Sequence, residues 1–445
     1  MKSSISGFPE FLPQEQMAFS RMLEVLRRKF ESYGFVPMDT PAVERVETLL
    51  AKGNDHEIYG LYRLADGVAK RDLGLRFDLT VPLARYVASH FGQLVFPYKR
   101  YHIAPVWRGE RPQQGRYRQF YQCDVDVIGD GALSIAHDAE ILLLVAEVLR
   151  SLKVPAFCTH INNRKILSGF LKTLIDDEQL TEAVRLMDKM DKISSDEFDN
   201  SLLRLGVSSE NIGKIREFLE SDDGRSNPEI LEWLKTLDFN DEFREGVAEL
   251  EEVFGILEEF GEAAESMRIS LKLARGLTYY TGNVFETVLD DFREIGSVAG
   301  GGRYNDLVGT LSDKKLPGVG ATIGVSRLTP KLLESGLLRA DELSTARILV
   351  TIQRRDRIGD YVKIARDLRQ MGIETETYLQ EKNLGAQLNY AAKKKIKFAL
   401  IANLEELQES RAIVRNLETG EQRRICTSPM DDEIQKIVGR GDEKT

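Results

Sequence analysis

The chain has 445 residues, of which 42% are hydrophobic and 30% are charged, a composition typical of a globular protein with more than one domain. Three cysteines, far apart and odd in number, argue against a disulfide framework, and five histidines, none after His160, argue against a histidine-rich metal site. The N-terminus has no apolar signal region and no run approaches membrane-spanning length, so we expect a cytoplasmic protein.

The net charge of −10 is unevenly distributed. Residues 216–265 contain 17 acidic and 4 basic residues, whereas residues 347–397 contain 12 basic and 6 acidic residues. The total charge argues against a nucleic-acid partner, but an acidic middle region and a basic C-terminal region average to a misleading total.

The first hundred residues alternate between helical and extended patterns. Helical spacing of apolar residues predicts a helix over 13–33, which Gly34 ends. Pro37 and Pro41 require an extended stretch after it. The elements expected next are a helix over 46–52, a hairpin over 61–68 and 74–77 with its turn at 65–67, and a helix over 80–91.

Residues 101–129 predict a long antiparallel hairpin with a charged loop that includes Arg108, Glu110 and Arg116. In the returning strand, polar Gln122 and Asp126 alternate with apolar residues, which predicts a half-buried strand. Guanidinium groups fit phosphate oxygens, so the loop suggests a polyanion site beside a small polar ligand. The simpler alternative is a solvated loop with surface ion pairs.

The middle of the chain predicts a helix over 138–152, a strand over 156–162 and a polar, helical block over about 164–265, which we interpret as an inserted subdomain. A strand over 269–273, two glycine-rich stretches, a helix over 323–334 and a linker over 335–345 follow. From residue 348 the pattern becomes βαβα, a compact α/β unit. Its expected strands are 348–353, 373–379 and 398–403, and its expected helices are 359–371, 384–394 and 431–438, with a charged hairpin before the last.

Several side chains could converge on one pocket. Arg108, Arg275 and Arg327 can clamp phosphates. Acceptors for an amine and for an imidazole-like group are offered by Asp78, Thr80, Gln122 and Asp126. Aromatic rings and hydroxyls are offered by Tyr279, Tyr280 and Tyr304. Together they suggest ATP and a small amine-bearing substrate. The chain has no P-loop or kinase motifs, and AGGGRYN lacks the Rossmann spacing. A tight turn for this glycine run and sheet packing for the paired tyrosines are the structural alternatives.

The hairpin VWRGERPQQGRYRQFYQCDVDVIG resembles motif 2 of class II aminoacyl-tRNA synthetases. PGVGATIGVSRL resembles motif 3, with Arg327 as its arginine, and DTPAVE resembles motif 1, the dimer-interface element. LARGLTYYTGNVFE and AGGGRYNDLV resemble the two signature stretches of histidyl-tRNA synthetases, and LRFDLTVPLARYVA matches too. The resemblance covers essentially the full chain, with its motifs in the same order.

The resemblance implies a mixed α/β (α+β) fold: a class II antiparallel catalytic sheet flanked by helices, a helical insertion and a C-terminal α/β anticodon-binding domain. The implied bounds are 1–335 for the catalytic domain, with the insertion at about 164–265, then 336–346 for a linker and 347–445 for the anticodon-binding domain. The implied function is histidine–tRNA ligase: ATP and Mg²⁺ convert histidine to an adenylate, and the histidyl group is transferred to the 3′ end of tRNA(His). A cytoplasmic homodimer is implied.

The family also implies roles for the ATP-binding residues. Arg108 would bind the α-phosphate and the histidine carboxylate region, and Arg275 would act at the α-phosphate as a second catalytic residue. Arg116 and Arg327 would hold the outer phosphates. Glu110 would contact adenine or a magnesium ion.

The family implies a second group of residues for histidine and tRNA. Asp78, Thr80 and Gln122 would hold the α-amino group. The imidazole would be read by Asp126 with Tyr279, Tyr280 and Tyr304. Gln113, at the tip of the motif-2 loop, would lie near the acceptor end of the tRNA. The sequence departs from the commoner bacterial pattern in having Asp78 and Asp126 in place of glutamate, which resembles the eukaryotic-type branch.

Three other functions compete. One is a regulatory partner of ATP phosphoribosyltransferase, whose paralogues typically lack the C-terminal domain and lose the ATP-binding arginines; Arg108, Arg116, Arg275 and Arg327 are all present here. The second is a sensor that binds uncharged tRNA without catalysis. The third is a class II enzyme for another amino acid, which the two histidine-type signatures oppose.

Overall fold

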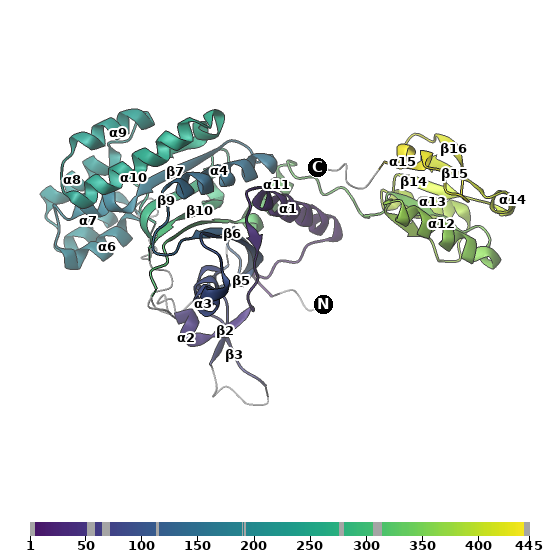
Figure 1. The fold of residues 1–445 in the computed structure, drawn as a ribbon, viewed down its shortest axis with the longest axis horizontal. Coiled ribbons are helices and arrows are strands. Elements are labelled where there is room, and N and C mark those ends of the chain that lie inside the picture. The colour runs from purple at the N-terminus through teal and green to yellow at the C-terminus, as the bar shows by residue number, and fades with distance from the viewer. Residues whose placement is uncertain are drawn as a thin grey trace. The chain divides into compact units, whose positions relative to one another are not determined.

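The structure is a computed structural model that describes residues 5–50, 58–64, 72–112, 115–188, 190, 193–275, 280–305 and 314–439. They form two compact units (Figure 1). The larger contains residues 19–338 and the N-terminal residues up to 10, and the smaller contains residues 11–18 and everything from residue 339. None of the described helices is long and apolar enough to cross a membrane.

Within the described residues, the larger unit is built on an eight-stranded sheet. In spatial order its strands are β1 (Val36–Pro37), β5 (Tyr98–Trp107), β6 (Gln119–Ile128), β11 (Gly318–Ile323), β10 (Ala299–Tyr304), β9 (Tyr280–Leu289), β7 (Phe157–Asn163) and β8 (Met267–Ile269). Neighbours from β5 to β7 are antiparallel, whereas the edge strands β1 and β8 pair in parallel. The predicted mixed α/β fold with an antiparallel central sheet is confirmed.

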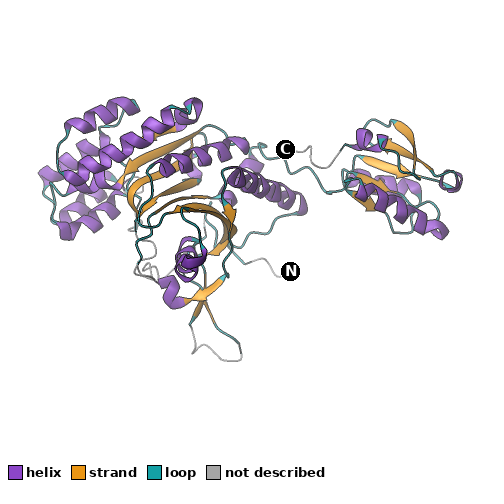
Figure 2. Cartoon of the chain, in the orientation of Figure 1, coloured by secondary structure: helices purple, strands orange, loops and turns teal. Residues whose placement is uncertain are grey.

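Helices cover the sheet on both faces (Figure 2). α4 (Ala136–Ser151) and α11 (Val325–Glu334) contact β6 and bury its apolar face. α3 (Thr80–His90) packs near the other face, where Leu83 and Val87 join Ile128 and Tyr304 in a hydrophobic cluster. The prediction of a half-buried β6 was therefore wrong: all its residues from 122 to 128 are buried, because the polar face is also enclosed.

The N-terminal elements follow the predicted order. α1 (Pro13–Ser32) ends before Gly34, whose φ of +78° suits glycine. β2 (Val43–Arg45), β3 (Gly60–Leu61) and β4 (Leu73–Leu75) form a small antiparallel sheet, with α2 (Val46–Leu49) after β2. The predicted hairpin turn at 65–67 lies outside the described residues.

The inserted block is helical, as predicted (Figure 1). It contains α5 (Arg164–Leu171), α6 (Asp177–Met187), α7 (Ser195–Arg204), α8 (Ser209–Glu220), α9 (Asn227–Thr236) and α10 (Asp241–Glu258). Asn163, Ser194, Ser208 and Asn240 each accept a backbone N–H from the first turn of the following helix, which fixes where these helices begin. After this block, the predicted helix 323–334 begins later, at Val325, because Ile323 pairs with Cys123 in the sheet.

The smaller unit is the predicted α/β unit. Its elements are β12 (Ile348–Val350), α12 (Ile358–Gln370), β13 (Thr375–Thr377), α13 (Leu384–Lys393), β14 (Phe398–Ile401), α14 (Leu404–Gln408), β15 (Arg411–Asn416), β16 (Gln422–Cys426) and α15 (Glu433–Val438). Strands β13, β12 and β14 are parallel neighbours, and β15 and β16 continue the sheet antiparallel. The sequence prediction missed α14, which a capping box between Asn403 and Glu406 begins.

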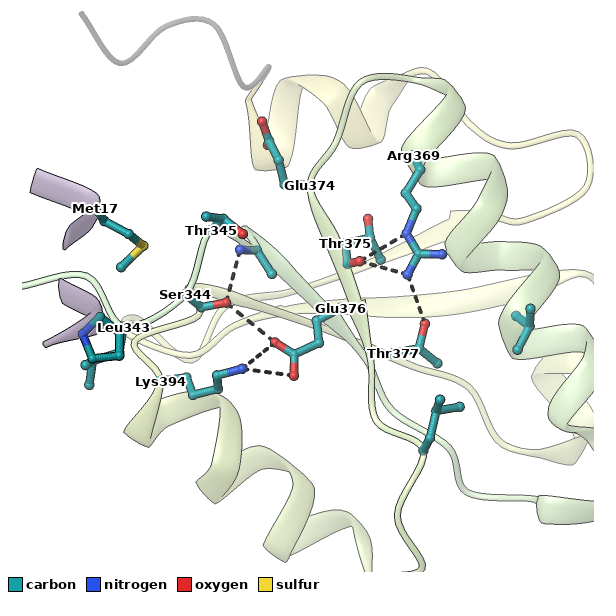
Figure 3. A pocket seen from close by; sticks show the side chains of 14 residues that line it. Met17, Leu343, Ser344, Thr345, Arg369, Glu374, Thr375, Glu376, Thr377 and Lys394 are labelled. Atoms are coloured by element: carbon teal, nitrogen blue, oxygen red, sulfur yellow. Dashed lines mark hydrogen bonds and ion pairs between the residues drawn. The ribbon is translucent and has the colours of Figure 1, made fainter. Parts of the chain in front are cut away.

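Polar contacts fix the edge strand β13 of this unit (Figure 3). Lys394 Nζ lies 2.8 Å from Glu376 Oε2, and Ser344 also donates to that oxygen at 3.5 Å. On the other side, Arg369 Nη2 donates to the Thr375 carbonyl at 2.9 Å. A short strand at the edge of a sheet is thereby held from two sides.

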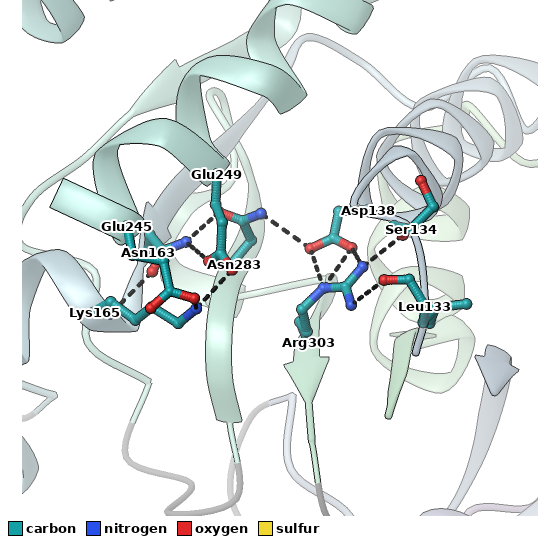
Figure 4. Close-up of polar contacts among 9 residues, drawn as sticks. All are labelled: Leu133, Ser134, Asp138, Asn163, Lys165, Glu245, Glu249, Asn283 and Arg303. Carbon is teal, nitrogen blue, oxygen red and sulfur yellow. Dashed lines mark hydrogen bonds and ion pairs between the residues drawn. The ribbon is translucent and has the colours of Figure 1, made fainter. Parts of the chain in front are cut away.

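A buried polar network ties the insertion to the sheet (Figure 4). Arg303 on β10 pairs with Asp138 on α4, with 2.6 Å between Nη2 and Oδ2. Asn283 on β9 donates to Asp138 Oδ1 at 3.0 Å and accepts from Asn163 Nδ2 at 2.9 Å. Asn163 also donates to Glu249 of α10 at 2.8 Å. The network therefore runs from an insertion helix through the central strands to the helix behind them.

We expect Asp138→Ala to destabilise this unit by about 3–5 kcal/mol, because it leaves the Arg303 guanidinium buried without its counter-ion. Urea unfolding followed by tryptophan fluorescence measures this, since both tryptophans, Trp107 and Trp233, belong to the larger unit. Glu210→Ala, which breaks the exposed pair with Lys214, serves as the control and should leave the unfolding midpoint unchanged. Equal midpoints for the two variants would contradict this expectation.

Candidate active site

The floor of the candidate site is made of glycines on two central strands. Gly300 and Gly302 of β10 pair with Thr322 and Gly320 of β11, so their missing side chains expose one face of the sheet. A Cβ at Gly320 would collide with the carboxylate of Asp126, and one at Gly300 would collide with the guanidinium of Arg275. The glycines therefore create the space that these side chains and a ligand share. The tight turn considered for residues 300–302 is wrong, because they lie within β10.

One end of the pocket is built around Asp126. Its Oδ2 lies 2.5 Å from Nη2 of the fully buried Arg100, and its Oδ1 accepts the Tyr304 hydroxyl at 3.0 Å. Burial, with the Asp126 carboxylate close by, raises the pKa of Tyr304 well above its usual value, so the phenol stays protonated and donates. Tyr280 lies opposite Tyr304 across β9 and β10 and also lines the pocket. This end offers a fixed carboxylate and two aromatic side chains.

The other end carries the predicted amine-binding residues. Thr80 lines the pocket at the start of α3, and Asp78 accepts the Val81 N–H at 3.0 Å, so its position is set by the first turn of that helix. Gln122 donates from Nε2 to the Thr322 hydroxyl oxygen at 3.3 Å. Its Oε1 is buried and has no hydrogen-bond partner among the described residues. A buried acceptor without a partner is a place where a ligand donor fits.

Three arginines and a glutamate meet near the motif-2 loop. Glu110 lies 3.9 Å from Arg108 Nη1 and 3.6 Å from Arg116 Nη1. Arg327 donates from Nε to the Gly115 carbonyl at 3.1 Å and from Nη1 to the Ser297 carbonyl. Burial lowers the pKa of Arg327, and the nearby Arg116 and Arg108 lower it further. The predicted phosphate-binding arginines thus converge, and their mutual repulsion favours an anion between them.

Arg108 and Arg275 are both anchored through backbone carbonyls. Arg108 Nε donates to the Phe77 carbonyl at 3.0 Å. Arg275 has a left-handed φ of +38° and donates from Nη1 to the Phe285 carbonyl at 2.9 Å. Its guanidinium carbon lies 5.8 Å from the centre of the Tyr280 ring. The structure thus brings Arg275 to the pocket, although it is distant in sequence from the motif-2 arginines.

Two predicted site residues, Gln113 and Tyr279, lie outside the described residues. Sequence reasoning also passed over three that the structure places at the site. Asp124 and Thr322 line the pocket, and Arg100 holds Asp126. The alternation of polar and apolar residues along β6 could have indicated Asp124 as a site residue, because it lies between Gln122 and Asp126 on the same face of the strand.

The described residues contain no cluster of three or more His, Cys, Asp or Glu side chains that could hold a metal ion. Glu110 by itself fits a magnesium ion only as one ligand among several. Magnesium commonly takes one or two carboxylates and completes its shell with substrate phosphates and water. The adjacent arginines also suit those phosphates.

The histidyl-tRNA synthetase family model matches residues 7–328, and an anticodon-binding domain model matches residues 340–437. The chain belongs to the histidyl-tRNA synthetase family. The curated relatives of this synthetase family include the histidine–tRNA ligase of Clostridium tetani, 43% identical over 94% of this chain and 95% of the relative. That of Nostoc sp. is 38% identical over 98% of this chain and 97% of the relative. The chain is accordingly an enzyme of the aminoacyl-tRNA synthetase class, a histidine–tRNA ligase.

Two solved structures have folds similar to that of this chain. The crystal structure of histidyl-tRNA synthetase from Nostoc sp. PCC 7120 matches with a TM-score of 0.87 at 37% identity, covering 98% of each chain. A Bacillus halodurans structure titled as an ATP phosphoribosyltransferase regulatory subunit/histidyl-tRNA synthetase matches with a TM-score of 0.72 at 20% identity, over 88% of this chain and 96% of that one. The second likeness shows a shared fold only.

We expect Gly320→Ala to abolish histidine binding, because the added methyl group occupies space held by the Asp126 carboxylate. Isothermal titration with histidine measures this. Gly213→Ala is the matched control: Gly213 lies within α8 with no atom near its missing side chain, so alanine should raise helix stability by about 0.5–1 kcal/mol and leave histidine binding intact. Unchanged binding by the Gly320→Ala variant would mean that the glycine floor is not the ligand site.

We expect Asp124→Asn to gain stability relative to the wild type as pH rises. Burial raises the pKa of Asp124 to about 7, an effect that Arg100 opposes and Asp126 reinforces. The folded protein therefore binds more protons than the unfolded chain between about pH 4 and pH 7, so wild-type stability falls across that window, whereas asparagine does not titrate. Thermal unfolding midpoints of both proteins at pH 5 and pH 8 test this. A difference that stays constant with pH would contradict it.

Proposed function

We propose that this site activates histidine with ATP and transfers the histidyl group to tRNA(His). The observation that supports it best is the grouping on one glycine floor of the Arg275 guanidinium, the fixed Asp126 carboxylate and Gln122 Oε1, a buried acceptor with no partner among the described residues. Such a pocket matches the three parts of a histidyl-adenylate: phosphate, imidazole and α-ammonium group.

Arginines carry the first step of the proposed mechanism. The histidine carboxylate attacks the α-phosphorus of ATP, a bond to the β-phosphate oxygen breaks, and pyrophosphate leaves. Arg108 would orient the two reacting groups, and Arg275 would stabilise the charge that gathers on the α-phosphate oxygens. Arg116 and Arg327 would hold the outer phosphates. A magnesium ion bound by Glu110 and the phosphates would neutralise further charge; Glu110 is also the residue proposed to contact adenine.

Histidine would lie along β6 with its two ends at different residues. The α-ammonium group would donate to Asp78, Thr80 and Gln122 Oε1. The imidazole would contact Asp126, whose carboxylate Arg100 and Tyr304 hold in place. Tyr280 would cover the ring, and Tyr279 belongs to the same proposed set.

The second step needs no covalent enzyme intermediate. A hydroxyl of the terminal tRNA ribose attacks the acyl carbon of the adenylate, and AMP leaves. Gln113 is proposed to lie near that acceptor end. Residues 347–445 would bind the anticodon, which the anticodon-binding model match and the basic excess of 347–397 support. The catalytic domain would span 1–335, with the insertion at about 164–265, and 336–346 would form the linker.

We also propose a homodimer in the cytoplasm, where tRNA charging supplies translation. The edge strand β1 comes just before the motif-1 stretch at residues 39–44, and Val36 and Val43, one in each segment, are exposed apolar residues. Apolar exposure beside a sheet edge favours a subunit contact.

Histidine-dependent ATP–pyrophosphate exchange tests the first step. Exchange is expected with histidine alone among the twenty amino acids, and Arg275→Ala should lower its rate about 100- to 1000-fold, because a preorganised charge at the α-phosphate is lost. Arg293→Ala, an exposed arginine in the same unit, is the control and should keep the wild-type rate. A folded wild-type protein without exchange would instead support the regulatory or tRNA-sensing alternatives, and exchange with another amino acid would reassign the substrate.

A further inference from the structure

The proposed mechanism gives no role to the acidic pocket residue Asp124. Gln122, Asp124 and Asp126 project from the same face of β6, and only the first and last have been assigned to the substrate. Asp124 lies between them, is 2% exposed and lines the pocket. A carboxylate is costly to bury, so its presence there calls for a function or a partner.

The partner of Asp124 is a threonine on the neighbouring strand. Thr322 lies directly opposite Asp124 in the β6–β11 register. Its hydroxyl donates to Asp124 Oδ1 at 2.6 Å, and its oxygen accepts Gln122 Nε2 at 3.3 Å. The three side chains therefore form one relay, in which the amide donates to the hydroxyl and the hydroxyl donates to the carboxylate.

The direction of this relay follows from the chemistry of its members. Once Asp124 is ionised, its carboxylate only accepts hydrogen bonds, and the Thr322 hydroxyl has a single proton to give. Once that proton points to Asp124, the Thr322 oxygen can only accept from Gln122, which must turn its NH₂ group toward it. The Gln122 carbonyl oxygen is then directed elsewhere, and it is the atom that lacks a partner among the described residues.

Some charged neighbours of Asp124 raise the pKa of its carboxyl group and others lower it. Arg100 favours its ionised form, while burial, Asp126 and Asp78 favour the protonated form. His102, its cross-strand neighbour on β5, has its pKa lowered to about 4 by burial and by Arg100, so it is neutral near pH 7. An α-ammonium group in the pocket would add a positive charge and favour the carboxylate.

We propose that Thr322 and Asp124 are positioning residues that fix the hydrogen-bond polarity of Gln122, so that the pocket presents an acceptor to the α-ammonium group of its amino-acid substrate. The inference rests on the proposed function, in which Gln122 binds that group. Without the relay, the Gln122 amide can rotate and offer NH₂ donors, which repel an ammonium group. A site built to hydrogen-bond one substrate group discriminates strongly against a ligand that lacks it.

Two ligands that differ only in the α-amino group test the relay. Binding of L-histidine and of 3-(imidazol-4-yl)propanoate is measured by isothermal titration calorimetry for the wild type and for Thr322→Val, which keeps the shape of the side chain and removes the hydroxyl. We expect the affinity for histidine to fall about 10-fold or more, as for loss of a hydrogen bond to a charged group, and the affinity for the propanoate to change less than twofold.

Three further variants make the result specific. Thr322→Ser keeps the hydroxyl and should retain wild-type discrimination. Asp124→Ala removes the terminal acceptor and should act like Thr322→Val, which covers the case that one variant does not fold. Thr287→Val is the matched control, because Thr287 is another buried threonine of this sheet, hydrogen-bonded at 2.9 Å to Thr159 rather than at the pocket. Its affinities for both ligands should equal those of the wild type.

The outcomes separate this inference from the proposed function. The relay would be overturned if the Thr322→Val and Asp124→Ala variants bound both ligands less tightly by the same factor, or bound both like the wild type. In that case, pyrophosphate exchange by the wild-type protein would still support the enzymatic function. Wild-type protein that binds histidine selectively over the propanoate but shows no exchange would overturn the catalytic proposal, and the variant comparison would still decide the relay. Wild-type protein that does not prefer histidine overturns the relay directly.

Discussion

The site depends on a steric constraint: positions on two central strands must carry no side chain. At Gly300, Gly302, Gly318 and Gly320 the space that a Cβ would fill belongs to Arg275, Tyr280, Tyr304 and Asp126 in turn. Because these strands are central, their backbone is held on both sides by sheet hydrogen bonds, so the floor is rigid without side-chain packing. A ligand can then lie close to the sheet, between groups whose positions the strands have set.

The same sheet keeps several ionisable side chains away from water, and each of the following has a hydrogen-bond or ion-pair partner. Asp126 is paired with Arg100 and bonded by Tyr304, and Asp124 accepts from Thr322 on the ligand face. On the face that α4 covers, Asp138 and Arg303 form a comparable pair that also reaches the insertion through Asn283. Removing one member of such a pair destabilises the protein, because the other charge stays buried without its partner. The proposed substrate recognition and the attachment of the insertion therefore rest on the same kind of interaction, on opposite faces of one sheet.

Local signals predicted most of the elements well. Gly34 ends α1, and the charged loop between a half-apolar run and an alternating run predicts the β5–β6 hairpin. The errors arose where distant contacts decide the outcome. Ile323 continues a strand because Cys123 pairs with it, and the polar face of β6 is buried in part by Tyr304, which bonds to Asp126. Neither partner is near in sequence.

The sequence by itself determined the family, the order of the elements and the candidate residues of the site, because arginines, acids and glycines at motif spacing carry that information locally. Only the tertiary structure decided how these groups act on one another. It brings Arg275 to a floor glycine, closes Asp126 between Arg100 and Tyr304, and aligns Gln122, Thr322 and Asp124 in one relay. The physical reason is strand register: whether two side chains share a hydrogen bond depends on which residues of distant segments face each other, and a single sequence does not fix that pairing.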